Sequence, residues 1–432
     1  MNYRIFIRAG VTSVVAVFLA VSSWAGVLKA GAARVSITPP ADEFPFTAEH
    51  ERAYYGVHDD VYARALALED EQQNRVVLVS LEVTEVPHAR EIVAEVAKVA
   101  SVTESHVLVM ATHTHNSLLV SYHGGEPGAV HAREMARAEQ AAVEAAKQAV
   151  AQLQPAKIAF GRGEAYLNIN NGEASGQKSW NDPTGFSDKG LDVLRLVNEK
   201  NEPIALLVNY ATHGEVMFRS ATKNGGYEVS GDLPGAVSHY LEGRTDAAPV
   251  VLFTSAAEGD QLPVFKSLQP SEHFEQADEG ASGWVLLDVE ARRLADAAID
   301  VAGIASEVNA ATLRAVSTTV ECPGKKRNLP PEQADAYAVP PVSIPLSLIR
   351  IGDVTLEGVG GDLASELGQK LKTASKAAHT TVITMTAGAV GYILPDASYQ
   401  RNSHGVAGSP LRAGCAETAL IQGFKRLEQE AR

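Results

Sequence analysis

The sequence has little cysteine, no excess of positive charge and no long hydrophobic run. Cys322 and Cys415 are the only cysteines among 432 residues, and two cysteines cannot form a thiolate metal site. They could pair in an exported protein, but the sequence does not give their separation in space, so the pairing stays open. The 37 Lys and Arg residues are outnumbered by 52 Asp and Glu, for a net charge of −15, and no basic stripe suits phosphates. We therefore expect no nucleic-acid partner.

The apolar stretch nearest the N-terminus, residues 9–21, is shorter than the ~20 residues needed to span a bilayer. Arg4 and Arg8 precede it, and the small residues Ser23 and Ala25 follow at the positions that a signal peptidase recognises. We therefore expect residues 1–25 to be a cleaved signal peptide and the protein to be secreted or periplasmic. An uncleaved N-terminal anchor is the alternative. Residues 26–432 would form the mature chain.

Strand and helix patterns alternate along this mature chain, which favours a mixed α/β fold with helices covering sheets. We expect strands at 34–38, 61–69, 76–83, 107–111, 204–210, 250–255, 316–322, 347–359 and 380–385. We expect helices at 88–100, 133–152, 233–241, 284–302 and 416–430. Six prolines between residues 323 and 345 predict an irregular loop that faces the substrate.

Three of the expected strands end in polar turns of a kind common in hydrolases. The turns read Thr112-His113-Thr114-His115-Asn116, Ala211-Thr212-His213-Gly214-Glu215 and Ser255-Ala256-Ala257-Glu258-Gly259-Asp260. Ligand clefts of α/β proteins usually lie at strand ends, so these turns are expected to meet in one site.

Histidines two residues apart at a strand end point to the same face, since side chains there alternate. Imidazole is the commonest zinc ligand, and a second imidazole nearby can carry protons. A hydrogen-bonded strand end is the alternative for His113 and His115, and His213 after a second buried strand favours the metal site. The sequence contains no Gly-x-Ser-x-Gly elbow, no His-Glu-x-x-His helix and no phosphate loop ending in Gly-Lys-Ser/Thr.

With these turns in place, the chain resembles the catalytic N-terminal domain of the neutral/alkaline (non-lysosomal) ceramidase family. The landmarks, in order, are Ile37-Thr38-Pro39-Pro40, Ala111-Thr112-His113-Thr114-His115, Val208-Asn209-Tyr210-Ala211-Thr212-His213, Ser230-Gly231-Asp232-Leu233-Pro234-Gly235 and Glu258-Gly259-Asp260. The resemblance implies a single large zinc hydrolase domain over residues 26–432. Because the chain stops soon after the last landmark, we expect it to lack the family's C-terminal immunoglobulin-like domain.

The resemblance also implies a set of zinc ligands, since the family binds one catalytic zinc through two histidines, a glutamate and a tyrosine. The matching positions are His113, His213, Asp362 and Tyr392. Each has a structural alternative: His213 as a structural histidine, Asp362 as the cap of a helix beginning at Leu363, and Tyr392 as a half-buried strand aromatic.

Further residues of the implied site would carry protons or orient the ligands. His115 matches the family's catalytic acid/base candidate. His404 falls near a tyrosine of the family pocket, and its imidazole can still donate a hydrogen bond. The carboxylates of Glu215 and Asp260 would orient ligand histidines or cap turns.

The chain departs from the family in ways that bear on the substrate more than on the metal. Leu262 stands where the family has a substrate-contacting serine, and Asn116-Ser117-Leu118-Leu119 replaces a small, Gly/Pro-rich turn. Asp362, one methylene shorter than the family's glutamate, is the departure within the ligand set.

We therefore expect a zinc-dependent hydrolase that cleaves the amide bond of an N-acylated, lipid-like substrate with a metal-activated water. Its partner is a small amphiphilic or N-acyl amide substrate, and peripheral contact with a membrane is compatible with this. The alternatives are a non-catalytic exported protein that binds zinc or a ligand, and a zinc-dependent esterase or phosphoester hydrolase. The sequence does not give the oligomeric state.

Overall fold

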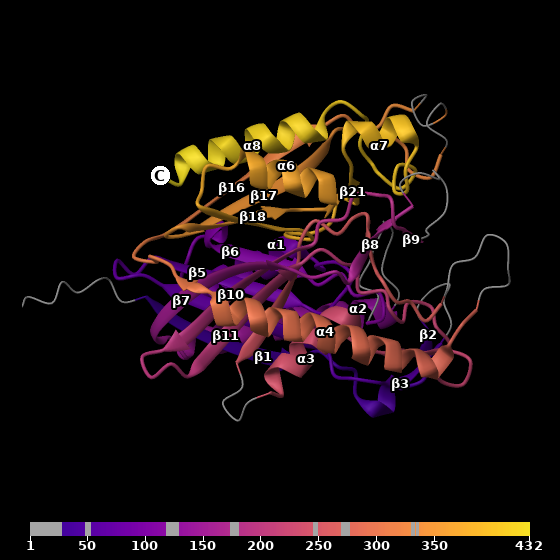
Figure 1. The fold of residues 1–432 in the computed structure, drawn as a ribbon, viewed down its shortest axis with the longest axis horizontal. Helices are drawn as coiled ribbons and strands as arrows, with labels where there is room; N and C mark the ends of the chain where they lie inside the picture. The colour runs from indigo at the N-terminus through magenta and orange to yellow at the C-terminus, as the bar shows by residue number, and fades with distance from the viewer. Residues whose placement is uncertain are drawn as a thin grey trace, which may run out of the picture.

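The computed structural model describes residues 28–47, 53–117, 129–172, 181–244, 249–268, 277–329, 333 and 337–432. The expected signal peptide and residues Leu118 and Leu119 lie outside these ranges. Within them the fold is mixed α/β with helices covering sheets, as the alternating sequence patterns predict (Figure 1).

Nine strands of the described residues form the larger sheet, in the order β13-β11-β10-β7-β1-β4-β5-β6, with β15 paired to β7. Their bounds are β1 Lys29–Ser36, β4 Tyr62–Glu69, β5 Arg75–Leu81, β6 Val107–Ala111, β7 Gln154–Glu164, β10 Gly190–Asn198, β11 Pro203–Tyr210, β13 Val250–Ser255 and β15 Ser306–Glu307. The pairs β5–β6 and β11–β13 are parallel. The carboxyl ends of β6 and β11 lead directly into the two histidine turns.

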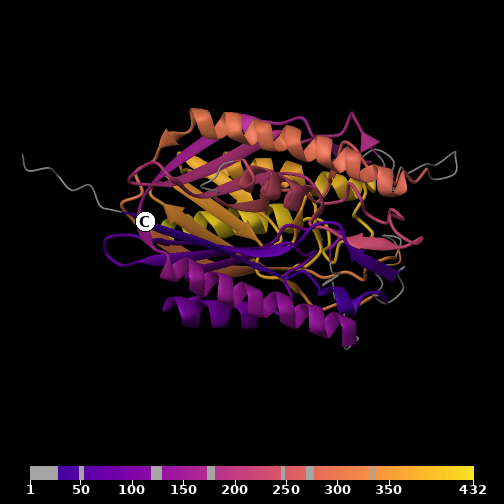
Figure 2. The same cartoon turned by 90° about the horizontal axis from the view of Figure 1, so that it is seen from below.

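Two helix pairs cover this sheet, one over each half. Helices α1 (Ala89–Ala100) and α2 (Ala129–Ala151) share a core with β4, β5 and β6, while α3 (Asp232–Glu242) and α4 (Gly283–Ile304) share another with β10, β11 and β13. Figure 2 shows the two pairs along opposite sides of the molecule. The alanine-rich α2 approaches β1 so closely that a Cβ on Gly31 would lie 2.2 Å from the carbonyl oxygen of Ala149. Glycine is therefore required there.

The smaller sheet packs against the other face of the larger one. It consists of β16 (Leu313–Cys322), β17 (Val342–Ile351), β18 (Val354–Val359) and β20 (His379–Ile383). Apolar side chains of both sheets meet in one buried cluster, which explains why β5 and β6 are apolar on both faces. Helices α6 (Ser365–Ala374) and α8 (Ala416–Glu430) cover the outer face (Figure 1).

Short elements complete the described fold. They are β2 Phe46–Thr47, β3 Ala53–Val57, β12 Tyr227–Val229, β8 Asn168–Asn171, β9 Asn181–Asp182, β14 Gln261–Pro263, β19 Asp362–Leu363, β21 Tyr392–Ile393, α7 Asp396–Arg401 and the 3-10 turns η1 Ala41–Glu43, η2 Glu104–His106 and η3 Gly280–Ser282. None of the helices in the described ranges combines the length and the apolar character needed to cross a membrane.

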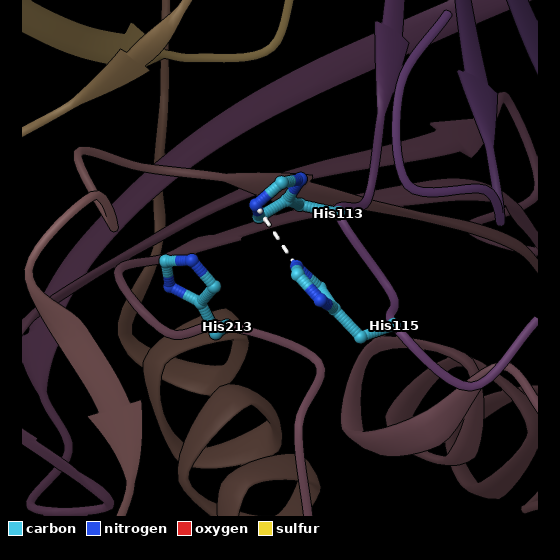
Figure 3. A group of neighbouring side chains, drawn as sticks. All are labelled: His113, His115 and His213. Atoms are coloured by element: carbon cyan, nitrogen blue, oxygen red, sulfur yellow. Dashed lines mark hydrogen bonds between the residues drawn. The ribbon is translucent and has the colours of Figure 1, made fainter. Parts of the chain in front are cut away.

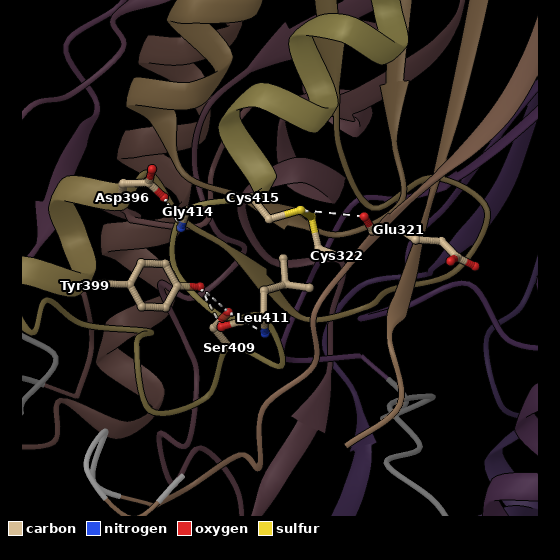
Figure 4. Close-up of a disulfide and its surroundings, with 8 residues drawn as sticks. All are labelled: Glu321, Cys322, Asp396, Tyr399, Ser409, Leu411, Gly414 and Cys415. Carbon is tan, nitrogen blue, oxygen red and sulfur yellow. Dashed lines mark hydrogen bonds between the residues drawn. A yellow bond between two sulfur atoms is a disulfide. The ribbon is translucent and has the colours of Figure 1, made fainter. Parts of the chain in front are cut away.

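Cys322, at the end of β16, and Cys415, directly before α8, form a disulfide with a Cα–Cα distance of 5.7 Å (Figure 4). The pairing that the sequence leaves open is thus present in the structure.

The loop predicted from the six prolines is wrong at its C-terminal end, because residues 342–345 belong to β17. Proline is accepted in this strand because Pro345 lies one residue beyond the stretch paired to β18, which ends at Leu346. Its missing N–H therefore leaves that ladder intact. The expected strand at 347–359 is likewise divided, into β17 and β18.

Candidate metal centre

His113 and His115 lie in the turn that follows β6. His113 has a left-handed backbone, with φ of 56°, a conformation that non-glycine residues adopt mainly where the surroundings impose it. Its Nδ1 lies 2.7 Å from the carbonyl oxygen of Thr84, in the turn after β5. That carbonyl can only accept, so Nδ1 carries the proton and Nε2 presents its lone pair to the site.

His213 reaches the same point from the end of β11. Its Nδ1 lies 3.1 Å from the carbonyl oxygen of Gln261, which also accepts a hydrogen bond from the His213 backbone N–H at 2.9 Å. The two histidine turns are joined by a hydrogen bond of 2.9 Å from the His115 N–H to the Gly214 carbonyl. His113, His115 and His213 each offer one ring nitrogen that could bind a metal, and these three nitrogens lie within 4.8 Å of one another (Figure 3). The structure thus brings all three histidines together.

Asp362 faces the histidines from the other side, at the start of β19. Its Oδ2 is 3.8 Å from Nε2 of His113 and 3.9 Å from Nε2 of His213. Ligand atoms on a tetrahedral zinc lie about 3.4 Å apart, as follows from zinc–nitrogen bonds of ~2.1 Å. Oδ1 of Asp362 is buried and has no hydrogen-bond partner among the described residues. A cation between Oδ2 and the histidine nitrogens would offset the cost of burying this carboxylate.

Asp362 is not the helix cap that its sequence position suggests as an alternative. Helix α6 begins at Ser365, and its backbone N–H donates to Asp260 at 2.8 Å. Asp260 also accepts from the Gln261 side-chain amide at 3.0 Å, so both of these contacts fix the local turn. The structure therefore favours a structural role for Asp260, whereas the Asp362 carboxylate is available to bind a metal.

Tyr392 is brought to the site by backbone pairing, since β21 pairs in parallel with β19 and aligns Tyr392 with Asp362. A Cβ on Gly405 or Gly408 would lie 3.1 or 3.2 Å from the Tyr392 ring, so these glycines allow the chain to pass over it. The imidazole of His404 lies edge-on to the ring, with centroids 5.8 Å apart. Both predicted residues are therefore at the site, although their roles stay predictions.

Burial and like charges set the electrostatics of the cluster. Burial, helped by the neighbouring His115 and His213, places the pKa of His113 well below its ordinary value. Burial also lowers the pKa of His115 to about 4 and that of His404 to about 4. Burial raises the pKa of Tyr392 well above its usual range, and the negative charge of Asp362 adds to this shift. At neutral pH the shifted pKa values leave the imidazoles of His113, His115 and His404 and the phenol of Tyr392 uncharged.

His115 differs from the other two histidines in the partner of its second nitrogen. Its Nδ1 lies 3.5 Å from Oε1 of Glu215, whereas His113 and His213 face backbone carbonyls. Glu215 is itself paired with Lys266 at 2.7 Å. Burial opposes ionisation of Glu215, but Lys266 and the histidines outweigh it and hold the pKa of this carboxyl below its ordinary value. The negative charge of Glu215 therefore lies next to the His115 ring. From the sequence we expect Glu215 to orient a histidine of the site or to cap a turn, and this contact is consistent with the first role.

A cavity of about 860 Å³ opens onto the cluster. Its walls include His113, His115, Asp362 and Tyr392, together with the segment 325–328. A volume of this size accommodates a small amphiphilic molecule. The expectation that the proline-rich segment faces the substrate is consistent with this lining.

Sequence reasoning missed several residues that shape the site. The backbone carbonyls of Thr84 and Gln261 orient the histidines, and a backbone group cannot be identified from the type of its side chain. Asp232, in the landmark Ser230-Gly231-Asp232, accepts hydrogen bonds of 2.9 Å from the N–H groups of Val216 and Met217 and so supports the turn after His213. Leu262, where the sequence departs from the family pattern, is buried in β14 and paired with Ile169.

The fold and the histidine cluster define a mixed α/β protein with a buried candidate metal centre, and comparison with known proteins agrees. Residues 28–276 match the family described as neutral/alkaline non-lysosomal ceramidase, N-terminal, and the chain belongs to this family. Membership supports hydrolase activity on an amide bond.

Two solved structures are similar to this chain. Neutral ceramidase from Pseudomonas aeruginosa has a TM-score of 0.73 at 18% sequence identity, covering 92% of this chain and 73% of that one. A ceramidase complexed with C2 has a TM-score of 0.72 at 17% identity, covering 94% and 76%. At such identities the likeness concerns the fold, which it confirms. A search of curated proteins finds no match to this chain.

Proposed function

We propose that the protein is a zinc-dependent amidase that cleaves the amide bond of an N-acylated, lipid-like substrate. The observation that carries the proposal is the convergence of three histidine nitrogens within 4.8 Å of one another beside Asp362, whose Oδ1 is buried without a hydrogen-bond partner among the described residues. Family membership supplies the reaction type, and the cavity supplies room for the substrate.

The residues present fit a zinc ion. His113 and His213 offer Nε2 lone pairs fixed by their backbone partners, Asp362 offers a carboxylate oxygen, and Tyr392 offers a phenolic oxygen from the neighbouring strand. Nitrogen and oxygen ligands of this kind suit zinc. Zinc, when bound, lowers the pKa of a water molecule to around 7 and polarises a carbonyl.

His115 is the proposed proton carrier. In the reaction, the oxygen of water bonds to the amide carbon, the C–N bond breaks, and a carboxylic acid and an amine leave. His115 would accept a proton from the water and deliver it to the nitrogen of the leaving amine. Its contact with Glu215 supports this role, because the carboxylate stabilises the imidazolium that forms in between. Tyr392 and His404 would donate hydrogen bonds to the oxygen on which negative charge develops.

The test measures zinc content and turnover on the same purified protein, with a panel of N-acyl amides, esters and phosphoesters. We expect close to one zinc per chain and hydrolysis of amides. Stoichiometric zinc without turnover of any substrate would favour a binding protein, which is the reading that Leu262 and Asp362 motivate. Turnover confined to esters or phosphoesters would make the protein a different hydrolase built on the same site.

We further propose that the protein acts outside the cytoplasm, as the N-terminal sequence predicts. The Cys322–Cys415 disulfide supports this, because such bonds persist mainly in oxidising compartments. Fractionation of expressing cells, together with N-terminal sequencing of the purified protein, tests the proposal. A chain recovered from the cytoplasm with residues 1–25 intact would contradict it.

A further inference from the structure

Three consecutive cations, Lys325, Lys326 and Arg327, line the cavity that contains His113 and Asp362. They are unusual in a chain with a net charge of −15. The carboxylates among the lining residues are Glu85 and Asp362, and Asp362 is directed at the histidines. Lys326 and Arg327 carry like charges in one wall, and an acidic ligand would relieve the repulsion between them.

The cationic segment is fixed in place by the chain that also covers Tyr392. The backbone N–H of Lys325 donates to the Pro410 carbonyl at 2.7 Å, and that of Asn328 donates to the Ala407 carbonyl at 2.8 Å. The disulfide links the two chain segments (Figure 4), since Cys322 precedes the cationic segment and Cys415 follows residues 405–411. The positions of the cations relative to the candidate zinc ligands are thereby set.

The three side chains differ in how they meet the cavity. Lys325 is buried and donates through Nζ to the Val406 carbonyl at 2.5 Å. Arg327 is half-buried and donates to the Val390 carbonyl, while Lys326 is exposed. A guanidinium has five donors, so a single carbonyl contact leaves Arg327 able to bind a carboxylate or phosphate in a forked manner.

We propose that this segment binds an acidic group of the substrate, so that the enzyme prefers N-acyl amides carrying a carboxylate, sulfonate or phosphate over neutral ones. The inference rests on the proposed amidase function for its substrate type. Lys326 and Arg327 act here as specificity-determining residues, and the hydrolysis itself belongs to the histidine side of the cavity.

The kinetic test compares N-octanoylglycine with N-octanoylethanolamine, which share the acyl chain and differ in the charge of the amine part. We expect kcat/KM about tenfold higher for the acidic amide, a ratio that one charge-assisted hydrogen bond can supply. In Lys326→Ala/Arg327→Ala the ratio should fall to near one, through loss on the acidic amide alone, and Arg327→Lys should retain part of it. Lys200→Ala removes an exposed lysine of the 198–202 turn and is the matched control. N-octanoyl taurine and N-octanoyl-ethanolamine phosphate then rank sulfonate and phosphate against carboxylate.

A binding measurement separates failure of this inference from failure of the amidase proposal. N-(octylsulfonyl)glycine and N-(octylsulfonyl)ethanolamine contain a sulfonamide in place of the amide, and calorimetry on the zinc-loaded protein gives their affinities without turnover. Tighter binding of the acidic compound, lost in the double variant, supports the cationic subsite even if no amide is hydrolysed. Equal affinities, or a preference that the double variant keeps, would overturn it, even if neutral amides are good substrates.

Discussion

The histidines of the candidate metal centre and the cations of segment 325–327 face the same cavity, but the fold holds them differently. His113 and His213 follow parallel strands of the larger sheet, and backbone carbonyls fix their rings. The cations lie on a segment after β16 that is attached through a disulfide and hydrogen bonds to the 405–411 chain. A metal centre tolerates little displacement of its ligands, whereas recognition of a charged group tolerates more.

This difference separates the chemistry from the choice of substrate. Changes on the histidine side should abolish turnover for every substrate, while changes on the cationic side should alter which substrate is preferred. Asp362 and Tyr392 line the cavity together with the histidines and the cations. They belong to the C-terminal part of the chain, like the cationic segment, and Asp362 faces the histidines.

The largest effect is expected from His113→Ala, which removes a proposed zinc ligand whose ring is held by the Thr84 carbonyl. Zinc content should fall below about one tenth per chain, and kcat/KM should fall by ~10³-fold or more, since in the proposed reaction the metal would supply both the nucleophile and the charge stabilisation. Elemental analysis and amide hydrolysis are the measurements. His106→Ala, in η2 and outside the cluster, is the control that should keep both. Full zinc and full turnover in His113→Ala would show that the site is misassigned.

His115→Ala distinguishes a proton carrier from a third histidine ligand. If His115 carries protons, the variant should keep its zinc while kcat falls by ~10²–10⁴-fold. Glu215→Gln should keep zinc as well and reduce kcat less, because it removes the charge that stabilises the imidazolium and leaves the imidazole in place. Loss of zinc from His115→Ala would instead make it a ligand, as its 3.2 Å approach to Nε2 of His113 also allows.

Breaking the disulfide should change the position of the cationic segment 325–327. Cys322→Ser/Cys415→Ser opens a loop closed by a separation of 93 residues, and removal of such a bond commonly costs about 2–5 kcal/mol. We expect a lower melting temperature, and at temperatures where the variant stays folded, a larger rise in KM for acidic amides than for neutral ones. Zinc content should not change. If zinc were lost while the substrate preference stayed, the separation of the two sides would be wrong.

The sequence predicts the histidine side of the molecule better than the cationic side, for physical reasons. Strands buried on both faces, such as β5, β6, β11 and β13, are continuous apolar runs, so their ends and the histidines after them can be located. Strand β7 is not predicted, because polar and charged residues such as Lys157, Arg162 and Glu164 interrupt it and leave no continuous apolar run. Backbone carbonyl partners have no sequence signature.

Asp362 and Asp260 illustrate the limit within the site itself. Both aspartates lie shortly after a buried strand, and sequence reasoning gave each a functional and a structural alternative. Only tertiary packing distinguishes them: Asp260 satisfies its oxygens on Ser365 and Gln261, whereas one Asp362 oxygen stays without a hydrogen-bond partner among the described residues. The resemblance to the family supplied Asp362, which pattern and propensity alone could not.

The smallest effect concerns stability of the smaller sheet and should leave zinc and turnover unchanged. Glu357, in β18, is fully buried, and neither carboxylate oxygen has a hydrogen-bond partner among the described residues. Burial raises its pKa to about 8, with a contribution from the negative charge of Glu428. The folded chain therefore binds this proton more tightly than the unfolded chain, whose glutamate titrates near 4.5. Stability from this group is complete below pH 4.5 and is lost as the pH rises through about 8.

Glu357→Gln replaces the carboxyl by a neutral group of the same shape and should remove this pH dependence. Denaturant unfolding of zinc-loaded protein should give similar stabilities for wild type and variant near pH 5, and a variant that is more stable near pH 8. A gain of about 1.4 kcal/mol, the equivalent of one pKa unit, is the smallest we expect. Glu430→Gln, exposed near the end of α8, is the control and should follow wild type at both pH values. If Glu357→Gln followed wild type as well, the carboxyl would have to be solvated or paired in the folded protein, and the packing between β18 and α8 would need to be looser than it is here.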